Sequence, residues 1–291
     1  MDSRDQRISR ELAAEYGRQA LQIIEQGYYT APSGARVELA GLIESSVRGT
    51  RSYPPGEALP DSLPGQFQTQ IEVENETTLS AARRLISAGC RPALLNFASA
   101  KHPGGGFLSG ARAQEEYLAR SSALYACLRG NAMYEFHRAR HDLLYTDYVL
   151  YSPDVPVFRA DVGGLLEEPY CVAMVTSPAV NAGPLLEYQP HRRAEIRPAM
   201  WTRILKVLAA GATHGHDAMV LGAWGCGAFG NDPAEIAKLF RQALDANFRG
   251  TFRRVAFAVL DWSEQQRTIG PFREAFRSVR ASGTQVQAGR A

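Results

Sequence analysis

The segment NFASAKHPGGGFLSGARAQEEY, residues 96–117, contains the residue types needed for acid–base chemistry on a bound ligand. Its consecutive glycines are Gly104, Gly105 and Gly106. Glycine loses more backbone freedom on folding than any other residue, but it lets the backbone lie directly against a ligand. Glu115 and Glu116 follow the glycines and can exchange protons with a substrate. Acidic residues are also favoured in the first turn of any helix, so the glutamates alone would indicate little. Together with the glycines, they predict a catalytic site.

A second glycine-rich loop, GAWGCGAFGNDPAE, covers residues 222–235. Asp232, Pro233 and Glu235 match the N-cap, first-turn proline and capping-box positions of a helix. Glycine N–H groups followed by a helix N-terminus favour an anion such as a diphosphate, although a tight turn without a ligand has the same pattern. Phe229 lies between small residues, where it would be either simply buried or a platform for a sugar or base. The candidate binding residues of this loop are Gly225, Gly227, Ala228, Phe229 and Gly230.

The elements that must position these loops are predicted from the spacing of apolar residues. Strands are expected at 67–74, 93–99, 147–153, 156–161, 170–178, 217–222 and 254–262, with a turn between 147–153 and 156–161. Helices are expected at 5–27 (ending at Gly27), from Thr77 (as the cap), at 114–128, at 192–210, after Asp232 and near the C-terminus. The proline-rich and glycine-rich residues 51–66 are expected to form a surface connection.

Several of the predicted strands are apolar without alternation, which is typical of a sheet covered by helices on both faces. Strands that alternate with helices predict a three-layer α/β/α architecture. Ligands bind at the carboxyl ends of strands in such sheets. A third loop, TSPAVNAGP, also follows a strand, and its Thr176 and Asn181 could hydrogen-bond a nucleotide, although they are ordinary turn formers. If the three strands are parallel neighbours, their loops converge on one cleft.

The composition sets limits on the function. The chain has 291 residues, 45% of them hydrophobic and 21% charged, with a net charge of +2. This charge neither favours nor excludes a polyanionic ligand in a local pocket, and without a basic stripe no direct nucleic-acid binding is expected. The cysteines form no CxxC pair, and the histidines show no spacing typical of metal ligands. His214 and His216 are expected in a solvated loop. The charged N-terminal segment and the lack of a long apolar run predict a cytoplasmic protein with no membrane span.

The motifs resemble those of a known family. GGG, seven residues and then QEE resemble the signature of poly(ADP-ribose) glycohydrolases. The flanking LNFASAKHPGGGFLSGARAQEEYLARSSALY is similar to the compact bacterial-type members, which are a macrodomain with an N-terminal extension. GCGAFGND resembles the diphosphate-binding loop of macrodomains, and TSPAVN also resembles the bacterial-type pattern. The resemblance extends over about residues 35–280 and is most specific at 95–125.

The resemblance implies a three-layer α/β/α macrodomain with a mixed central sheet. It would comprise a mainly helical N-terminal extension (1–35), a catalytic domain (36–280) and a disordered tail (281–291). The implied reaction is hydrolysis of the ribose–ribose O-glycosidic bond of poly(ADP-ribose), which releases ADP-ribose. Poly(ADP-ribosyl)ated proteins would be the substrates, and the protein would act as a monomer without a metal or other cofactor.

The resemblance also implies roles for individual residues. Glu116 would be the catalytic acid and base, and Glu115 would position sugar hydroxyls. Gln114 would support the catalytic loop, and Phe229 would pack against the distal ribose. The glycines at 104–106 would contact the diphosphate through their backbone. The substrate-binding set is Gln114, Gly104, Gly105, Gly106, Asn96, Thr176, Asn181, Gly225, Gly227, Ala228, Phe229 and Gly230.

Adjacent glutamates favour a reaction with one working carboxyl group. Glycosidases usually hold two carboxylates on opposite sides of the bond. Neighbouring residues of a helix point roughly 100° apart, so Glu115 and Glu116 cannot easily flank a sugar in that way. We therefore expect Glu116 to protonate the leaving oxygen and then, once ionised, to activate a water.

Two macrodomain activities and one other class are alternatives. A macrodomain could instead remove single ADP-ribose units, or bind ADP-ribose without turnover. The complete GGG and QEE element disfavours the first, and the paired glutamates disfavour the second. A nucleic-acid-binding module would require a basic stripe with interleaved aromatic residues, which the sequence lacks.

Overall fold

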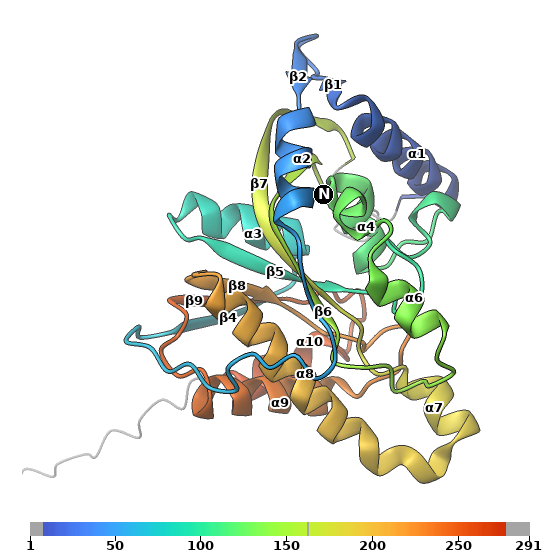
Figure 1. The fold of residues 1–291 in the computed structure, drawn as a ribbon. Coiled ribbons are helices and arrows are strands. Elements are labelled where there is room, and N and C mark those ends of the chain that lie inside the picture. The colour runs from blue at the N-terminus through green and yellow to red at the C-terminus, as the bar shows by residue number, and fades with distance from the viewer. Residues whose placement is uncertain (1–7, 162, 278–291) are drawn as a thin grey trace, which may run out of the picture.

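The computed structural model describes residues 8–161 and 163–277, which form a mixed sheet between two layers of helices (Figure 1). The sheet has seven strands in the order β3-β6-β7-β5-β8-β9-β4. The strands are β3 (Arg51–Tyr53), β4 (Gln70–Glu74), β5 (Pro92–Phe97), β6 (Val149–Arg159), β7 (Leu165–Ser177), β8 (Ala218–Leu221) and β9 (Arg254–Ala258). β7, β5, β8, β9 and β4 run parallel, and β6 and β3 are antiparallel to their neighbours. The three-layer architecture with a mixed sheet is confirmed.

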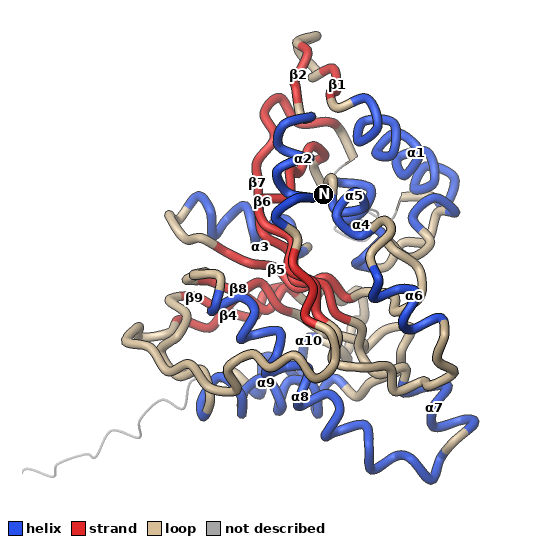
Figure 2. The backbone as a smooth tube through the Cα atoms, in the orientation of Figure 1, coloured by secondary structure: helices blue, strands red, loops and turns tan. Residues whose placement is uncertain are grey.

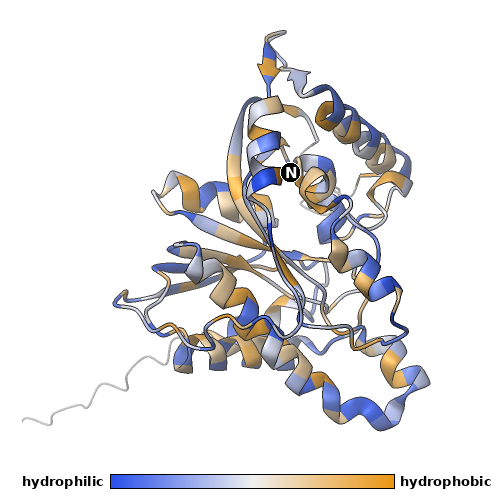
Figure 3. Cartoon of the chain, viewed as in Figure 1, coloured by the Kyte–Doolittle hydropathy of each residue, from blue (hydrophilic) through white to orange (hydrophobic). Residues whose placement is uncertain are grey.

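Successive residues of the strands point to opposite faces, and each face has its own apolar core. On β5, Leu95 packs with the core beneath α8 and α9, whereas Leu94 packs with the core beneath α1 to α5. The helices are α1 (Arg10–Gln26), α2 (Ala40–Gly49), α3 (Thr78–Ser87), α4 (Gln114–Ser121), α5 (Leu124–Leu128), α6 (Ala132–Arg138), α7 (Ala182–Tyr188), α8 (Arg193–Thr213), α9 (Pro233–Ala246) and α10 (Ile269–Ala275). Figure 3 shows hydrophobic and hydrophilic residues on the same helices, as expected of helices that bury one face.

Local signals set several helix ends where the sequence predicts them. Gly27 ends α1 in a left-handed conformation, φ 76°, and its N–H donates to the carbonyl of Ile23. Thr77 caps α3, and Asp232 caps α9 by accepting the N–H of Ala234. The capping box predicted for Glu235 is not formed, because its carboxylate pairs with Arg197 of the neighbouring α8 instead.

Two predicted elements differ in the structure. Residues 147–161 do not form two strands around a turn, because β6 is continuous and pairs along its length with β7 (Figure 2). The two strands shift register between Ser152 and Val155, where Asp154 has φ 45°, so the apparent turn is a β-bulge. The helix predicted at 114–128 is interrupted at Ser122, which adopts an extended conformation and bridges to Val157.

Three further regions complete the fold. The predicted surface connection 51–66 begins with β3, which pairs with β6 at the edge of the sheet. A hairpin of β1 (Tyr28–Thr30) and β2 (Arg36–Glu38) follows α1. The tail predicted from residue 281 lies outside the described residues. Among the described residues, no helix is both long and apolar enough to cross a membrane.

The expectation of solvated histidines after α8 is wrong. His214 stacks on Tyr151 with ring centroids 3.6 Å apart and hydrogen-bonds the hydroxyl of Tyr53 at 2.8 Å. His216 is buried, and its ring bonds the hydroxyl of Tyr151 and the carbonyl of Arg91. The segment is covered because β6 and β3 pack beside the end of α8, a contact between segments far apart in the sequence.

Candidate active site

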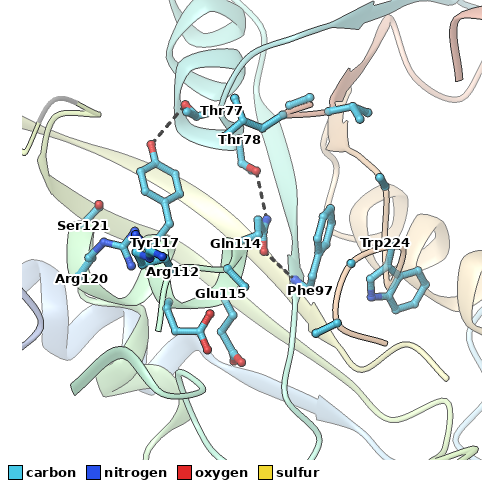
Figure 4. Close-up of a pocket in the computed structure, with 18 of the residues that line it drawn as sticks. Thr77, Thr78, Phe97, Arg112, Gln114, Glu115, Tyr117, Arg120, Ser121 and Trp224 are labelled. Atoms are coloured by element: carbon cyan, nitrogen blue, oxygen red, sulfur yellow. Dashed lines mark hydrogen bonds between the residues drawn. The ribbon is translucent and has the colours of Figure 1, made fainter. Parts of the chain in front are cut away.

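The predicted loops meet at one edge of the sheet because β7, β5 and β8 are parallel neighbours. They border a cleft of about 660 Å³, part of which is drawn in Figure 4. Of the predicted site residues, the cleft is lined by Gln114, Glu115, Glu116, Gly225, Gly227, Ala228 and Phe229. The other predicted residues lie beneath or beside this lining.

Gln114 fastens the first turn of α4 to its surroundings (Figure 4). Its Oε1 accepts the backbone N–H of Phe97 at 2.9 Å, at the end of β5. Its Nε2 donates to the carbonyl of Leu95 at 2.8 Å and to the hydroxyl of Thr78 at 3.1 Å. Both N–H groups and one acceptor direction of the amide are thereby used on the protein, so Gln114 fixes where the following glutamates point.

Glu115 is almost completely buried and its carboxylate is held by donors from β5 and the loop after it. Ser99 N–H donates to Oε2 at 2.6 Å, and Asn96 Nδ2 lies 3.4 Å from Oε1. Burial raises the pKa of Glu115 to about 8, and repulsion from Glu116 adds to the rise, while the Ser99 N–H opposes it. Glu115 is therefore largely neutral at neutral pH.

Glu116 is the carboxylate with an unused oxygen. Its Oε1 accepts the N–H of Gly106 at 3.0 Å, whereas its buried Oε2 has no hydrogen-bond partner among the described residues. Gly105 has φ 57°, and a Cβ on it would lie 2.2 Å from Oε1 of Glu116. A Cβ on Gly104 would likewise be crowded, because it would lie 3.0 Å from the ring of Phe107. The glycines thus let the loop wrap closely around Glu116, a reason for the triplet additional to any contact with a diphosphate.

Asn96 and Thr176 form a buried support for Glu115 and do not line the cleft. Both side chains are completely buried, and Asn96 Nδ2 bridges Glu115 and the Thr176 hydroxyl, which lies 3.2 Å away. Asn181 precedes α7, and its N–H donates to Leu143 O, outside the cleft lining. These three residues were predicted to contact the substrate, but they do not line the cleft; Asn96 lies beneath Glu115, which covers the end of β5.

The loop after β8 forms the opposite wall. Trp224 is buried and donates from its indole N–H to the carbonyl of Ser177 at 3.2 Å (Figure 4). Asn231 Nδ2 donates to the carbonyls of Val180 and Gly225 and so closes the loop. Gly230, φ 69°, packs against the backbone of Gly183 and lies outside the lining. Phe229 is partly buried, with the Tyr145 ring 6.1 Å from its own.

Sequence reasoning missed several residues of the cleft. Two groups share the lining with the predicted residues: an apolar group after β9, with Val259, Leu260 and Trp262, and a polar group with Thr77, Tyr117, Asp161, Arg112, Arg120 and Arg159. The strand predicted at 254–262 already pointed to the first group, because a parallel β9 ends at the same edge. Helical spacing from Glu116 pointed to Arg120, four residues later. Nothing local predicts Arg159 or Asp161, which arrive from the end of β6.

Comparisons with known proteins agree with this geometry. A family model described as microbial-type PARG, catalytic domain, matches residues 17–160. A crystal structure of poly(ADP-ribose) glycohydrolase from Thermomonospora curvata, bound to the inhibitor ADP-HPD, is 47% identical, with a TM-score of 0.82; the match covers 91% of this chain and 99% of that one. A structure of the enzyme from Deinococcus radiodurans with ADP-ribose is 46% identical over 84% of this chain and 100% of that one, with a TM-score of 0.79. The comparison with curated proteins gave no match.

Proposed function

We propose that this chain, which belongs to the microbial-type poly(ADP-ribose) glycohydrolase family, hydrolyses the O-glycosidic bonds between riboses of poly(ADP-ribose) and releases ADP-ribose. The main support for this chemistry is the burial and hydrogen bonding of Glu116. It is a buried carboxyl group at the cleft, held by one N–H and with its second oxygen free of protein partners. Such an oxygen is available to a substrate.

Glu116 acts first as an acid in the proposed mechanism. Its proton passes to the 2′-oxygen of the leaving ribose while the bond from that oxygen to the anomeric carbon breaks. The electron pair of the bond stays on the leaving oxygen, and positive charge develops on the sugar as an oxocarbenium ion. The negative charge of the bound diphosphate stabilises this cation.

Glu116 then acts as a base. As a carboxylate it takes a proton from a water molecule whose oxygen attacks the anomeric carbon, and it returns to its acid form. One carboxyl group performs both steps, and no further reactant is consumed. Glu115 is less suited to this role because both of its oxygens already receive protein donors. We assign to Glu115 the positioning of the sugar hydroxyls.

The wall formed by the loop after β8 supports the other end of the substrate. Gly225, Gly227 and Ala228 present backbone at the cleft just before the N-terminus of α9, an arrangement that suits a diphosphate. Phe229 faces the same cleft, so its ring can pack against the distal ribose and orient the anomeric carbon toward Glu116. Gln114 keeps the glutamates in register with this wall.

The substrate carrier, the location and the oligomeric state of the enzyme are also proposed. We propose that the polymer is carried by poly(ADP-ribosyl)ated proteins and that the enzyme works in the cytoplasm as a monomer, without a metal and without direct nucleic-acid binding. The net charge of +2 supports the last point, because it provides little general attraction for nucleic acid. Light scattering of the purified protein gives its molar mass and so tests whether it is a monomer.

The deciding experiment compares wild type with Glu116→Gln on poly(ADP-ribose) in EDTA, with products separated by chromatography. We expect the substitution to lower turnover by about 10³-fold, as loss of an acid–base group does, while calorimetry shows ADP-ribose still bound. The matched control is Glu44→Gln on the exposed surface of α2, which should leave turnover unchanged.

Three outcomes would contradict the proposal. Substantial turnover by Glu116→Gln would remove that residue from the mechanism. ADP-ribose binding without turnover by wild type would indicate a macrodomain that only binds its ligand. Activity on mono-modified substrates alone, with polymer left intact, would favour the mono-ADP-ribosyl hydrolase instead.

A further inference from the structure

Three arginines line the part of the cleft between α1, α4 and the end of β6. Arg112 donates to the carbonyl of Ile8 at 2.9 Å, and Arg120 donates to the carbonyl of Ala111 at 3.3 Å. Arg159 donates to the carbonyl of Arg120 at 3.0 Å. Within residues 8–161 and 163–277, none of the three forms an ion pair. Their hydrogen bonds to protein go to neutral groups.

Two of these guanidinium groups are buried. Arg120 is 6% exposed and Arg159 is 3% exposed. Burial lowers the pKa of Arg159 to about 10 and also lowers the pKa of Arg120, which shows that the charged forms are held at a cost. Glu116 partly offsets this cost for Arg120, and the exposed Glu15 of α1 does so for Arg159, but neither carboxylate comes within ion-pair distance. An anion that enters the cleft would offset this cost.

Arg159 is fixed by several contacts. It stacks over the ring of Tyr16 at 4.3 Å and donates to the carbonyl of Gly163 and to the side chain of Gln19. Its donors are therefore mostly used, and it contributes chiefly charge. Among residues 8–161 and 163–277, Arg120 and the exposed Arg112 have N–H groups left without a partner, which a ligand could use. An anion bound here would feel the positive charge of Arg159 and could accept hydrogen bonds from the guanidinium groups of Arg112 and Arg120.

The cluster lies on the side of the glutamates away from the loop after β8. Figure 4 shows Arg112 and Arg120 on one side of Glu115 and Trp224 on the other. Arg120 follows Glu116 by one helical turn, so both lie on the same face of α4. A polymer whose terminal ADP-ribose fills the space beside Trp224 would extend past the glutamates toward the arginines. In that polymer, only one ribose and its 5′ carbon separate the leaving oxygen from the nearest phosphorus.

From this arrangement we infer that Arg112, Arg120 and Arg159 form a second anion subsite, which binds the diphosphate of the leaving polymer unit. The inference rests on the proposed function, because it takes poly(ADP-ribose) as the substrate. Arg112 and Arg120 donate hydrogen bonds to the phosphate oxygens, and the buried Arg159 contributes positive charge next to them. The subsite holds the leaving ribose near Glu116 and favours substrates with a phosphate next to the scissile bond.

The test uses two substrates in which ADP-ribose is joined to the 2′-oxygen of either ADP or plain adenosine. For Arg112→Gln, we expect kcat/KM on the ADP-linked substrate to fall about tenfold, the usual effect of losing a charge-assisted hydrogen bond, and kcat/KM on the adenosine-linked substrate to stay unchanged. Arg120→Lys should produce a smaller loss with the same selectivity. Arg48→Gln on exposed α2 is the control and should change neither substrate.

A binding measurement separates this inference from the proposed function. Calorimetry follows ADP binding to protein already saturated with ADP-ribose, which needs no turnover. We expect wild type to bind this second nucleotide and Arg112→Gln to bind it about tenfold more weakly. Equal losses on both substrates, or no ADP binding to the saturated protein, would overturn the subsite. Absence of turnover by wild type, with ADP still bound at the second position, would overturn only the proposed reaction.

Discussion

At the scale of single residues, the site depends on contacts that leave no room for another atom. Oε1 of Glu116 is held by the N–H of Gly106, while the buried Oε2 has no partner among the described residues, and the bond from Gly106 forms only if the preceding glycine lets the backbone come close. In the proposed mechanism, Gly105 therefore contributes by positioning Glu116, although it has no side chain. Its left-handed φ of 57° adds a second requirement, which glycine meets without strain.

We predict that Gly105→Ala removes most activity from a protein that still folds. A Cβ 2.2 Å from Oε1 of Glu116 forces the carboxyl group or the loop to move. A displacement of this size costs about 10²-fold in kcat, and the strained backbone costs about 1–2 kcal/mol of unfolding free energy. Steady-state kinetics and chemical denaturation measure the two effects.

Gly41→Ala is the matched control, since Gly41 lies in α2 with nothing near its Cβ position. It should keep full activity and gain slightly in stability, because alanine is a better helix former. Wild-type kcat in Gly105→Ala would show that the close contact does not position Glu116.

At the scale of elements, α1 supports the catalytic loop directly. A Cβ on Gly17 of α1 would lie 2.5 Å from the carbonyl oxygen of Phe107, and one on Gly110 would lie 2.1 Å from the carbonyl oxygen of Arg10. The backbones of helix and loop are thus in contact at two places. We therefore propose that the N-terminal extension, residues 1–35, is part of the catalytic unit at 36–280 and holds the loop that surrounds Glu116.

This proposal predicts that Gly17→Leu weakens both stability and catalysis. The added side chain must push α1 away from residues 107–110, which costs about 1–3 kcal/mol of unfolding free energy. Since the same loop carries the N–H that holds Glu116, kcat should fall as well. The exposed neighbour Arg18→Ala should change neither quantity. A destabilised Gly17→Leu with normal kcat would mean that α1 is only a structural addition.

At the scale of the whole molecule, buried titrating groups of opposite sign set the stability profile. Burial lowers the pKa of His137 and His216 from 6.5 to about 4 and lowers that of His214 as well. Burial raises the pKa of Glu115 from 4.5 to about 8.

The directions of these pKa shifts predict that the protein is most stable near pH 6.5. Between pH 4.5 and 6.5, the unfolded chain binds protons at the histidines, whereas the folded protein binds one at Glu115, so the histidines outweigh it and stability rises with pH. Between pH 6.5 and 8 only Glu115 remains, and stability falls by up to ~1.4 kcal/mol per pH unit. Urea denaturation across this range measures the profile.

Two variants test which group causes the rise and which causes the fall in stability with pH. Glu115→Gln should remove the decrease above pH 6.5, and His216→Gln should flatten the increase below it. A profile in Glu115→Gln that runs parallel to wild type above pH 6.5 would mean that Glu115 is not the group that takes up the proton.

The sequence by itself determined the features that depend on near neighbours. Gly27 ends α1 and Thr77 begins α3 because a left-handed glycine and a capping hydroxyl act within one turn. The GGG and QEE pattern predicted that the glycine loop and the pair of glutamates belong to one site, and the structure brings them into contact at the cleft. Apolar runs also indicated the layered fold, because burial on both faces leaves no alternation.

Only the tertiary structure decided what depends on segments far apart in the chain. Asp154 forms a bulge, not a turn, because β7 offers a partner along the whole of β6. His216 is buried and His214 is half-buried because β6 and β3 pack against the end of α8, and Asn96 lies beneath Glu115 because α4 covers the end of β5. Arg159 reaches Arg120 by the same long-range packing. Local patterns contain no information about such partners, because the free energy that fixes them comes from contacts made only in the folded chain.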